Sequence, residues 1–478
     1  MTVAAAMFGS VHALGAVAVL AVAALAVAAP ASASEPLLVR SSLPTTDALF
    51  GQVIATRAEG DLVELVVAAP SLDGARGFVQ LVTIEGQQLT VSASLRPADL
   101  VPNERFGYSV AISSTAIAVG SPFGSAAPGK VRVFPRTASG IGSAVLIGSP
   151  DPAVSDAFGH AVATWGDWLA VGEPLDDSSG TAQDRGAVHL FRRSADGAWH
   201  AHARIVSPDA VAGDTFGYTL TMDAATLVVA SRFADVGSMQ QAGAVWTVDL
   251  GTSGSVGAPV RVQAPDPGAY EWFGASVAIE GNTLVVGACR DTISAQVSEQ
   301  GTTRVFRRTE AGWSQQAMLV SPGAATQDRF GNSVAIDHGR ILVGADGQDP
   351  AAVSLAGRLQ LYVETPTGWA HDRAFELDPG TTNQNLGVAC SLHDRLIVGG
   401  APRHTPPAGV MREGAVGVWQ LDAPCPADFD QDGSISGPDL GVLLSQWGLP
   451  GSSDLNSDGV VDAADLGFML AGWGPCAP

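Results

Sequence analysis

The dipeptide Phe-Gly recurs along this chain at nearly constant spacing, and this repeat constrains the fold more than any other feature. Its six copies begin at Phe50, Phe106, Phe158, Phe216, Phe273 and Phe330, and Leu386-Gly387 takes the seventh place. The intervals between successive copies are 56, 52, 58, 57, 57 and 56 residues. A fixed period of this length indicates an array of one repeated structural unit.

Each unit continues in the same order after its dipeptide. A short alternating run, such as residues 109–112, is followed by a tight turn and by a second run that ends in small residues, such as 284–288. A longer loop leads to a third run, and a fourth run often opens with Trp, as at Trp313. Alternation with period two and β-branched residues between turns predicts four antiparallel strands per unit. Seven such units predict a mainly β chain that forms a seven-bladed β-propeller.

The two ends of the repeat region support the count of seven. The last unit stops at its third strand, residues 414–421, whereas an additional strand, residues 36–42, precedes the first Phe-Gly. We expect this N-terminal strand to supply the missing outer edge of the seventh blade. The ring would then close by hydrogen bonds between the two ends of the chain.

The Phe-Gly start and the small residues that end the second strand, as in the Val-Gly-Gly-Ala-Pro of residues 398–402, resemble FG-GAP repeats. These repeats build the propeller of integrin α-chains and occur in many exported bacterial proteins. The resemblance covers residues 36–422 and implies a binding or adhesion role. Integrin-type blades place an Asp-rich calcium loop between their first two strands. Here those connections are short hairpins with few ligands, such as residues 113–115, so propeller-bound calcium is not implied.

The N-terminus has the pattern of a secretory signal peptide. Residues 14–29 contain only Ala, Val, Leu and Gly, and small residues around Ala33 follow, which predicts cleavage after Ala33. An uncleaved anchor is the alternative, although this run is short for a bilayer span. We therefore expect a secreted, extracellular or surface-associated protein with no membrane span after cleavage.

The charge balance excludes one class of partner. The chain has 47 acidic and 25 basic residues, a formal charge of -22, and Lys130 is its only lysine. A protein that binds a phosphate backbone needs a basic surface, which this composition does not provide. Nucleic acid is therefore not an expected partner.

The long connections, between strands two and three and between blades, should emerge on one face of the propeller. We expect an extracellular protein or glycan to bind there, because binding sites favour loops on a rigid scaffold. The residue two before Phe is acidic in five units: Glu104, Asp156, Asp214, Glu271 and Asp328. Either each caps the turn into its first strand, or together they form an acidic ring that binds a cation or a basic partner.

The propeller sequence predicts no catalytic residues and no cofactor-binding residues, because its nine His are scattered and no paired carboxylate stands out. His200 and His202 share one face of an outer strand and could hold zinc. Without a third ligand they are better interpreted as a surface pair. Cys289 and Cys390 fall two blades apart, so both are expected to be unbonded.

Residues 425–478 differ in composition, with eight Asp and no Lys, Arg or Glu. They contain a duplicated loop with oxygen donors at positions 1, 3, 5, 7, 9 and 12 and Gly at position 6. The predicted ligands are Asp428, Asp430, Asp432, Ser434, Ser436 and Asp439 in the first loop and Asp454, Asn456, Asp458, Val460, Asp462 and Asp465 in the second. This pattern predicts two calcium ions. Apolar helices at 440–447 and 466–473 follow the loops, and their Leu and Trp side chains are expected to pack over the two sites.

The duplicated loop and helix, with Asp at position 12 and a Gly-Trp-Gly-Pro-Cys ending, resembles a dockerin of the Cys-bracketed kind. The resemblance implies a disulfide between Cys425 and Cys476 and a docking or anchoring role toward a cohesin-like or cell-surface partner. Loop positions 10 and 11 carry Gly437-Pro438 and Ala463-Ala464 instead of the hydroxyl residues that help to recognise a cohesin. A standard cohesin is therefore not the expected partner, and a calcium-stabilised end cap is the alternative.

These patterns divide the chain into a signal peptide (1–33), a propeller (34–422) and a dockerin-like domain (423–478). The first functional hypothesis is an exported, non-enzymatic binding or adhesion protein. The alternative is a polysaccharide-degrading propeller enzyme, a lyase or hydrolase, with a dockerin anchor.

Overall fold

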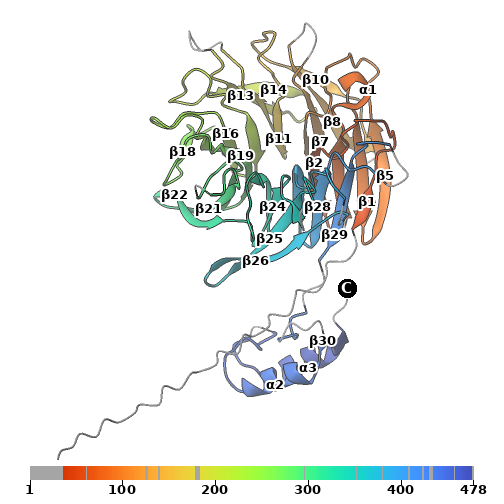
Figure 1. Ribbon diagram of the computed structural model, residues 1–478, viewed down its shortest axis with the longest axis vertical. Helices are drawn as coiled ribbons and strands as arrows, with labels where there is room; N and C mark the ends of the chain where they lie inside the picture. Colours follow the sequence, from red (N-terminus) through yellow and green to blue (C-terminus); the bar gives the residue numbers. More distant parts are fainter. Residues whose placement is uncertain are drawn as a thin grey trace, which may run out of the picture. The chain divides into compact units, whose positions relative to one another are not determined.

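The computed structural model contains seven antiparallel sheets arranged as blades around a central axis (Figure 1). It describes residues 36–475 except 61, 124–127, 138–139, 178–182, 295, 351–352, 379–380, 407–409, 422–424, 430–433 and 457. The predicted signal peptide and its cleavage site at Ala33 lie outside the described residues. The predicted fold class, a mainly β seven-bladed propeller with four-stranded blades, is confirmed.

Each blade runs from an inner to an outer strand in chain order. Blade 1 consists of β2 (Val53–Glu59), β3 (Leu62–Ala68), β4 (Val79–Glu85) and β5 (Gln88–Leu95). Blade 2 consists of β6 (Ser109–Ile112), β7 (Ala116–Ser121), β8 (Lys130–Thr137) and β10 (Val145–Gly148), with β9 (Gly140–Ile141) beside β8. Blade 3 consists of β11 (Ala161–Trp165), β12 (Trp168–Glu173), β13 (Ala187–Arg193) and β14 (Trp199–Ile205). A short helix, α1 (Leu72–Ala75), lies in the long loop of blade 1.

The remaining blades repeat this order, except that the outer strand of blade 7 is the N-terminal strand β1. Blade 4 consists of β15 (Thr219–Met222), β16 (Thr226–Ser231), β17 (Ala244–Asp249) and β18 (Val260–Val262), and blade 5 of β19 (Phe273–Glu280), β20 (Thr283–Ala288), β21 (Thr302–Thr309) and β22 (Gly312–Leu319). Blade 6 consists of β23 (Phe330–Asp337), β24 (Arg340–Ala345), β25 (Arg358–Thr365) and β26 (Gly368–Phe375). Blade 7 consists of β27 (Ala389–His393), β28 (Leu396–Ala401), β29 (Ala415–Gln420) and β1 (Leu37–Val39).

The inner strands contact one another in a closed cycle, from β2 through β6, β11, β15, β19, β23 and β27 back to β2. Hydrogen bonds join neighbouring blades along this cycle. Ser109 Oγ donates to the carbonyl of Gly159 at 2.8 Å, and Ser276 Oγ donates to the carbonyl of Gly331 at 2.8 Å. Every blade therefore buries its faces against two neighbours, as in a complete ring.

The Phe-Gly motif forms the junction between successive blades. Its aromatic ring is buried, and its backbone lies against a glycine that precedes the third strand of the preceding blade. At Gly301, which has a φ of +79°, an added Cβ would lie only 2.1 Å from the carbonyl oxygen of Phe330. The same approach occurs at seven junctions: Gly77 with Phe106, Gly129 with Phe158, Gly186 with Phe216, Gly243 with Phe273, Gly301 with Phe330, Gly357 with Leu386 and Gly414 with Phe50.

The N-terminal strand closes the ring. Strand β1 pairs antiparallel with β29, with Leu38 opposite Gly417, so the two ends of the propeller chain lie side by side in blade 7 (Figure 1). The strand covers residues 37–39 of the predicted 36–42. Closure by an N-terminal strand is therefore confirmed.

Deletion of residues 36–42 should destabilise the propeller, because the deletion removes β1 and leaves β29 as an unpaired edge. We expect a melting temperature several degrees lower and aggregation in size-exclusion chromatography. A truncated protein that stays monomeric and melts at the wild-type temperature would contradict this role.

The C-terminal unit contains β30 (Ser434–Ile435), α2 (Gly437–Ser445), α3 (Ala463–Ala471) and β31 (Gly474–Pro475). Both helices begin about three residues earlier than predicted, because Ser436 and Asp462 form capping boxes with Asp439 and Asp465. The predicted packing of the Trp side chains is wrong. Trp447 and Trp473 remain 44% and 47% exposed.

Other side chains form the small core of this unit. Its fully or nearly buried members are Ala427, Ile435, Leu443, Val461 and Met469.

None of the helices in the described ranges is long and apolar enough to cross a membrane. The predicted domain boundary at 422–423 falls within residues that the structure does not describe.

Candidate functional site

The second C-terminal loop folds around its predicted ligands. Asp454 accepts hydrogen bonds from the backbone N–H groups of Asp458 at 3.2 Å and Gly459 at 2.8 Å. Asp465 is fully buried and accepts from the N–H groups of Leu455 at 2.7 Å and Asp462 at 2.8 Å. Hydrogen bonds from backbone N–H groups, that of Asp462 foremost, lower the pKa of Asp465, so this carboxylate is ionised at neutral pH. The loop therefore holds charged oxygens in a compact turn.

In the described part of the first loop, the position-12 residue makes the same contacts as its counterpart 26 residues later. Asp439 is fully buried and accepts from the N–H groups of Phe429 at 2.6 Å and Ser436 at 2.9 Å. Asp428 and Ser434 are also among the described residues, whereas the predicted ligands Asp430 and Asp432 lie outside them. The two position-12 carboxylates are thus held in equivalent places by equivalent backbone donors.

The donors of both loops fit a calcium site chemically. In the second loop, Asn456 Nδ2 donates to Asp458 at 3.0 Å and the Asp458 N–H bonds to Asp454 and Asn456, while Val460 can offer its backbone carbonyl as a ligand. Positions 10 and 11 of the loops fall in the first turns of α2 and α3. Cys425 is disulfide-bonded, and Cys476, its predicted partner, lies outside the described residues.

The acidic residues two before each Phe act mainly as turn caps. Asp214 and Asp328 each accept a hydrogen bond at 2.8 Å, from the N–H groups of Val211 and Ala325. Glu104 accepts in the same way from Val101 and also pairs with the buried Arg132. Burial raises the pKa of Asp214, Glu271 and Asp328. These contacts favour the capping interpretation over an acidic ring, with Asp156 considered separately below.

A chain of aromatic side chains crosses the loop-rich face of blades 2 to 5, at the entrance to the inner strands. The ring centroids of successive members lie 4.3 to 5.5 Å apart. Three guanidinium groups lie over these rings, at 4.0 to 5.3 Å from their centroids. The aromatic-arginine belt consists of Phe123, Tyr108, His160, Tyr218, Phe233 and Trp272 with Arg105, Arg232 and Arg290.

His160 lies near the middle of this belt and is neutral. Its Nδ1 lies 3.1 Å from the carbonyl oxygen of Tyr218, so Nδ1 donates and Nε2 accepts from the Tyr108 hydroxyl at 3.2 Å. Burial lowers the pKa of His160 to about 4. Burial and the nearby Tyr218 raise the pKa of Tyr108. The centre of the belt therefore holds an uncharged imidazole and an uncharged phenol side by side.

Arg232 supplies positive charge to the belt. Its guanidinium stacks over Tyr218 at 4.0 Å and Trp272 at 4.6 Å and donates to the Tyr218 hydroxyl at 2.5 Å. Like most of the belt, Arg232 is half-buried, and Phe123 is 36% exposed. A half-buried guanidinium held between aromatic faces is suited to bind a carboxylate or to stack on a planar group.

Sequence analysis did not identify the belt. The only signal in the sequence is the residue after Phe-Gly, which is Tyr108, His160 and Tyr218 in three successive units but small or aliphatic, or an amide, in the others. Because these positions open the inner strands, adjacent blades bring them together.

The opposite mouth of the ring contains a cavity of about 680 Å³ lined by the hairpins of all seven blades. Its carboxylates are used to join blades. Asp223 accepts from the N–H of Gly281 at 3.1 Å, and Glu280 accepts from the N–H of His338 at 3.1 Å. Asp337 accepts from the N–H of Asp394 in the same manner. This mouth is therefore acidic for structural reasons.

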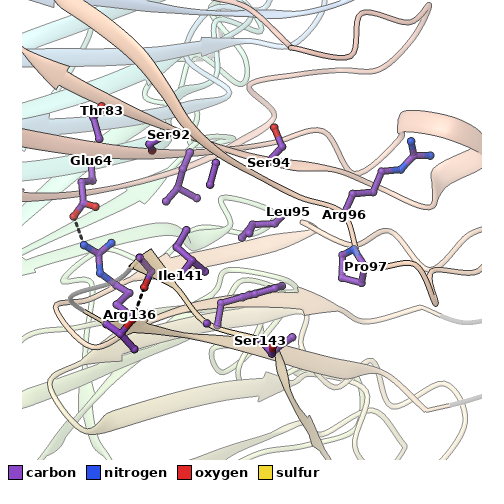
Figure 2. Close-up of a pocket in the computed structure, with 17 residues that line it drawn as sticks. Glu64, Thr83, Ser92, Ser94, Leu95, Arg96, Pro97, Arg136, Ile141 and Ser143 are labelled. Carbon is purple, nitrogen blue, oxygen red and sulfur yellow. Dashed lines mark hydrogen bonds and ion pairs between the residues drawn. The ribbon is translucent and has the colours of Figure 1, made fainter.

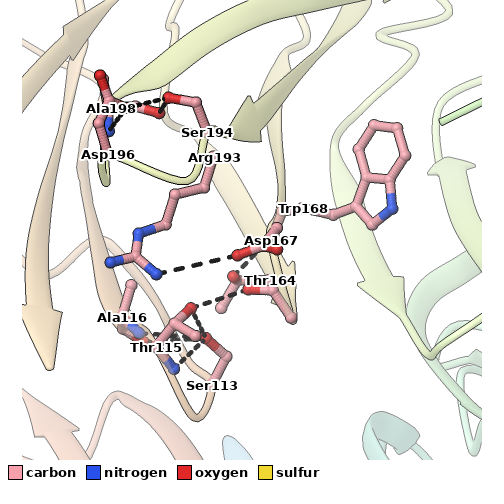
Figure 3. Close-up of polar contacts among 11 residues, drawn as sticks. Ser113, Thr115, Ala116, Thr164, Asp167, Trp168, Arg193, Ser194, Asp196 and Ala198 are labelled. Atoms are coloured by element: carbon pink, nitrogen blue, oxygen red, sulfur yellow. Dashed lines mark hydrogen bonds and ion pairs between the residues drawn. The ribbon is translucent and has the colours of Figure 1, made fainter. Parts of the chain in front are cut away.

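Between the hairpins of blades 2 and 3, a hydroxyl group instead of a carboxylate makes the contact that joins the blades. In Figure 3, Thr115 Oγ1 donates to the Gly166 carbonyl of the next blade at 2.8 Å, while Arg193 lies 3.9 Å from Asp167. Thr164 and Ser194 complete their own turns. The described hairpins of blades 2 and 3 contain no cluster of metal-binding side chains.

A groove of about 800 Å³ lies between the outer halves of blades 1 and 2 (Figure 2). Glu64 is half-buried at one end of the groove, and it accepts from Arg136 at 2.5 Å and from Arg57 at 3.0 Å. The groove therefore has a neutralised ion pair at one end and mixed side chains elsewhere. The described residues that line the groove include no convergent polar groups comparable with those of the belt.

The remaining candidates from the sequence do not form sites. His200 Nε2 lies 3.2 Å from Ser194 Oγ, whereas His202 Nε2 lies 2.7 Å from the Gly254 carbonyl, so the two rings serve separate partners. Cys289 and Cys390 are both free thiols, and burial raises their pKa to about 11 and about 12. Both are thus unreactive at neutral pH.

The repeated unit of this chain matches a known protein family. The FG-GAP repeat model matches residues 89–134, 144–191, 199–248, 259–306 and 313–362, which together cover half of the chain. The chain belongs to the FG-GAP repeat family. Each match begins within one residue of the start of the outer strand of one blade and ends in the third strand of the next. The matched units of this FG-GAP propeller therefore extend across blades 1 to 6.

Individual proteins resemble this chain less closely than the family model does. No curated protein matches this FG-GAP chain. A periplasmic gluconolactonase from Pseudomonas aeruginosa has a similar solved structure, with a TM-score of 0.45 and 14% identity over 69% of this chain and 86% of the other. A likeness at this level concerns the fold alone, and its activity is not carried over.

One expectation requires correction. Sequence analysis predicted a protein that is not an enzyme, in part because the propeller showed no catalytic pattern. That prediction is corrected, because the similar propeller is described as a gluconolactonase, which is an enzyme. The FG-GAP propeller is therefore not assigned as non-enzymatic.

Proposed function

We propose that this FG-GAP protein is an exported binding protein whose propeller captures an extracellular protein or glycan through the aromatic-arginine belt. The belt itself carries the proposal. Tyr, Trp and Arg are the side chains that contribute most to binding energy at recognition surfaces. Tyr218, Arg232 and Trp272 lie in contact on the face that is built of long loops.

The charges of the two mouths support this choice of face. At the hairpin mouth, Asp223, Glu280 and Asp337 are already bonded to neighbouring blades. At the loop-rich mouth, the Arg232 guanidinium has an aromatic environment and one hydroxyl partner among the described residues. A ligand carboxylate or sulfate would gain a charge-assisted hydrogen bond there.

The C-terminal unit complements the propeller in this proposal. Its two loops bind two calcium ions, and its folded form serves as a docking or surface-anchoring module. Exposed apolar side chains on and after its helices, including Leu444, Trp447 and Phe468, support a docking role.

An array of extracellular glycans and surface proteins, probed with the full-length protein in calcium, tests the proposal. We expect retention of a ligand class that carries acidic groups, and loss of that retention in high salt. An array without retained ligand under low salt would contradict the binding function.

Polysaccharide cleavage is a second candidate because Tyr108 and His160 form a hydroxyl-imidazole pair beside Arg232. Such a set can move a proton next to a carboxylate that the guanidinium neutralises. Each retained glycan should therefore be incubated with the protein and examined for shorter products. Intact glycans in every case would remove this candidate and leave the binding function.

A further inference from the structure

A cluster of metal-binding side chains lies inside blade 3, apart from the C-terminal loops. Glu173 ends β12, Asp176 follows in the long loop, and His189 lies in β13. Their ligand atoms all lie within 4.8 Å of one another. The exposed fractions of the three residues are 1%, 2% and 2%, so the cluster is enclosed by the blade.

Two atoms of this cluster lack hydrogen-bond partners among the described residues. They are His189 Nε2 and Glu173 Oε1. His189 Nε2 lies 2.7 Å from Glu173 Oε2, but the two atoms do not form a hydrogen bond. The carboxylate oxygen therefore lies outside the direction in which the imidazole nitrogen can donate or accept a hydrogen bond. A buried polar atom without a partner costs roughly 1–3 kcal/mol. The fold therefore holds two unsatisfied atoms where one ligand would satisfy both.

The neighbouring groups orient the carboxylates. Ser149 Oγ donates to Glu173 Oε2 at 2.9 Å, and Arg204 donates to Asp176 Oδ2 at 2.7 Å. Asp156 is also buried and interacts electrostatically with Glu173 and Asp176. Three buried carboxylates are thus accompanied by one guanidinium, and buried charge requires further compensation.

Blade 5 shows how the same position is satisfied without a ligand. Arg304 occupies the place of His189, the third residue of its strand, and Asp291 occupies the place of Asp176. Arg304 pairs with Asp291 at 3.4 Å and also with Asp266, while Thr302 donates to Asp291 at 2.7 Å. The place of Glu173 is taken by Ala288. Blade 5 therefore has a fixed cation and one fewer carboxylate.

We propose that Glu173, Asp176 and His189 bind one divalent transition-metal ion of the zinc type. An imidazole nitrogen with two carboxylate oxygens is a donor set that Zn²⁺ accepts, and an ion with two positive charges offsets the excess of buried carboxylates. The ion occupies the position that the Arg304 guanidinium takes in blade 5. Because the cluster is enclosed, the ion is structural and fixes Asp176, three residues after the end of β12, against His189 of β13.

Metal analysis of the full-length protein tests this site. The protein is stripped with a chelator, returned to millimolar calcium so that the C-terminal loops are filled, loaded with Zn²⁺ or Co²⁺ and dialysed. We expect one retained ion per chain and a melting temperature of the propeller that rises with loading. His189→Gln should lose the retained ion.

Two variants separate metal binding from folding. His189→Arg copies blade 5, so we expect it to fold, to retain no ion and to melt at a temperature independent of Zn²⁺. The double variant His200→Ala/His202→Ala, on exposed histidines of the same blade, should retain the ion. The proposal is overturned if the loaded wild-type protein retains no stoichiometric ion, or if His189→Arg retains as much as the wild type. If His189→Gln fails to fold, these two measurements still decide the question.

Discussion

Removal of calcium is expected to unfold the C-terminal unit reversibly and to leave the propeller folded. The unit carries eight Asp and no basic residue. Its two position-12 carboxylates, Asp439 and Asp465, are completely buried. Without cations the crowded carboxylates repel one another, and a unit of this size buries too little apolar surface to offset that repulsion.

Calorimetry of the full-length protein measures this effect. We expect a separate unfolding transition for the C-terminal unit in calcium, and its loss in a calcium-selective chelator. Titration should find two calcium ions per chain. Asp428→Asn and Asp454→Asn should each remove one ion, because Asn lacks the negative charge that attracts calcium. Asn keeps the size of Asp and one acceptor oxygen, so the change tests the charge alone. Identical circular dichroism and melting with calcium and with chelator would contradict the calcium assignment, and the dockerin resemblance would then describe ancestry alone.

The second large effect is expected at a blade junction. Gly301→Ala should destabilise the propeller by at least about 3 kcal/mol, because backbone strain adds to a steric clash. The new Cβ would lie 2.1 Å from the Phe330 carbonyl oxygen and 2.7 Å from the Phe330 nitrogen. Neither backbone atom can move without separating blades 5 and 6.

Gly281→Ala is the matched control for this junction. Gly281 also has a positive φ, +55°, but no atom lies within 4 Å of the place that an added Cβ would take. This variant should cost only about 1 kcal/mol from the unfavourable backbone angle. Chemical denaturation of both variants measures the difference. Equal destabilisation would show that the close approach to Phe330 does not hold the ring together.

The propeller could be predicted from sequence because one spacing encodes it. Each Phe-Gly marks a blade junction, and alternation within each unit specifies the strands. The missing fourth strand of the last unit also indicated β1, since a complete blade needs a partner for β29. These features depend on residues that are close in sequence or repeated at a fixed interval.

The belt could not be predicted in the same way. Tyr108, His160 and Tyr218 come from three blades, and only the closed ring brings them into contact. The cluster in blade 3 has the same origin, because Glu173 and His189 lie on neighbouring strands with a long loop between them. Single residues at such positions show no pattern until the register of the sheets is known.

The C-terminal unit illustrates both cases. The spacing of its donors placed Asp439 and Asp465 at position 12 of the two loops, and each accepts a hydrogen bond from an equivalent backbone N–H group. The packing of Trp447 and Trp473 was predicted wrongly, because helical periodicity alone does not say which apolar side chains face the partner helix. Leu443 and Met469 occupy that place.

The most direct test of the proposed function compares the two mouths of the propeller. Binding of the ligand class retained on the array is measured for Arg232→Ala in the belt and for Trp165→Ala, which changes an exposed residue of the hairpin cavity. Loss of a central Arg at a recognition surface typically costs 2 kcal/mol or more, about a 30-fold change in Kd. We predict such a loss for Arg232→Ala and a Kd within about twofold of wild type for Trp165→Ala, with both variants melting near the wild-type temperature. Unchanged affinity in a folded Arg232→Ala protein, or equal loss in both variants, would contradict the assignment of ligand binding to the aromatic-arginine belt.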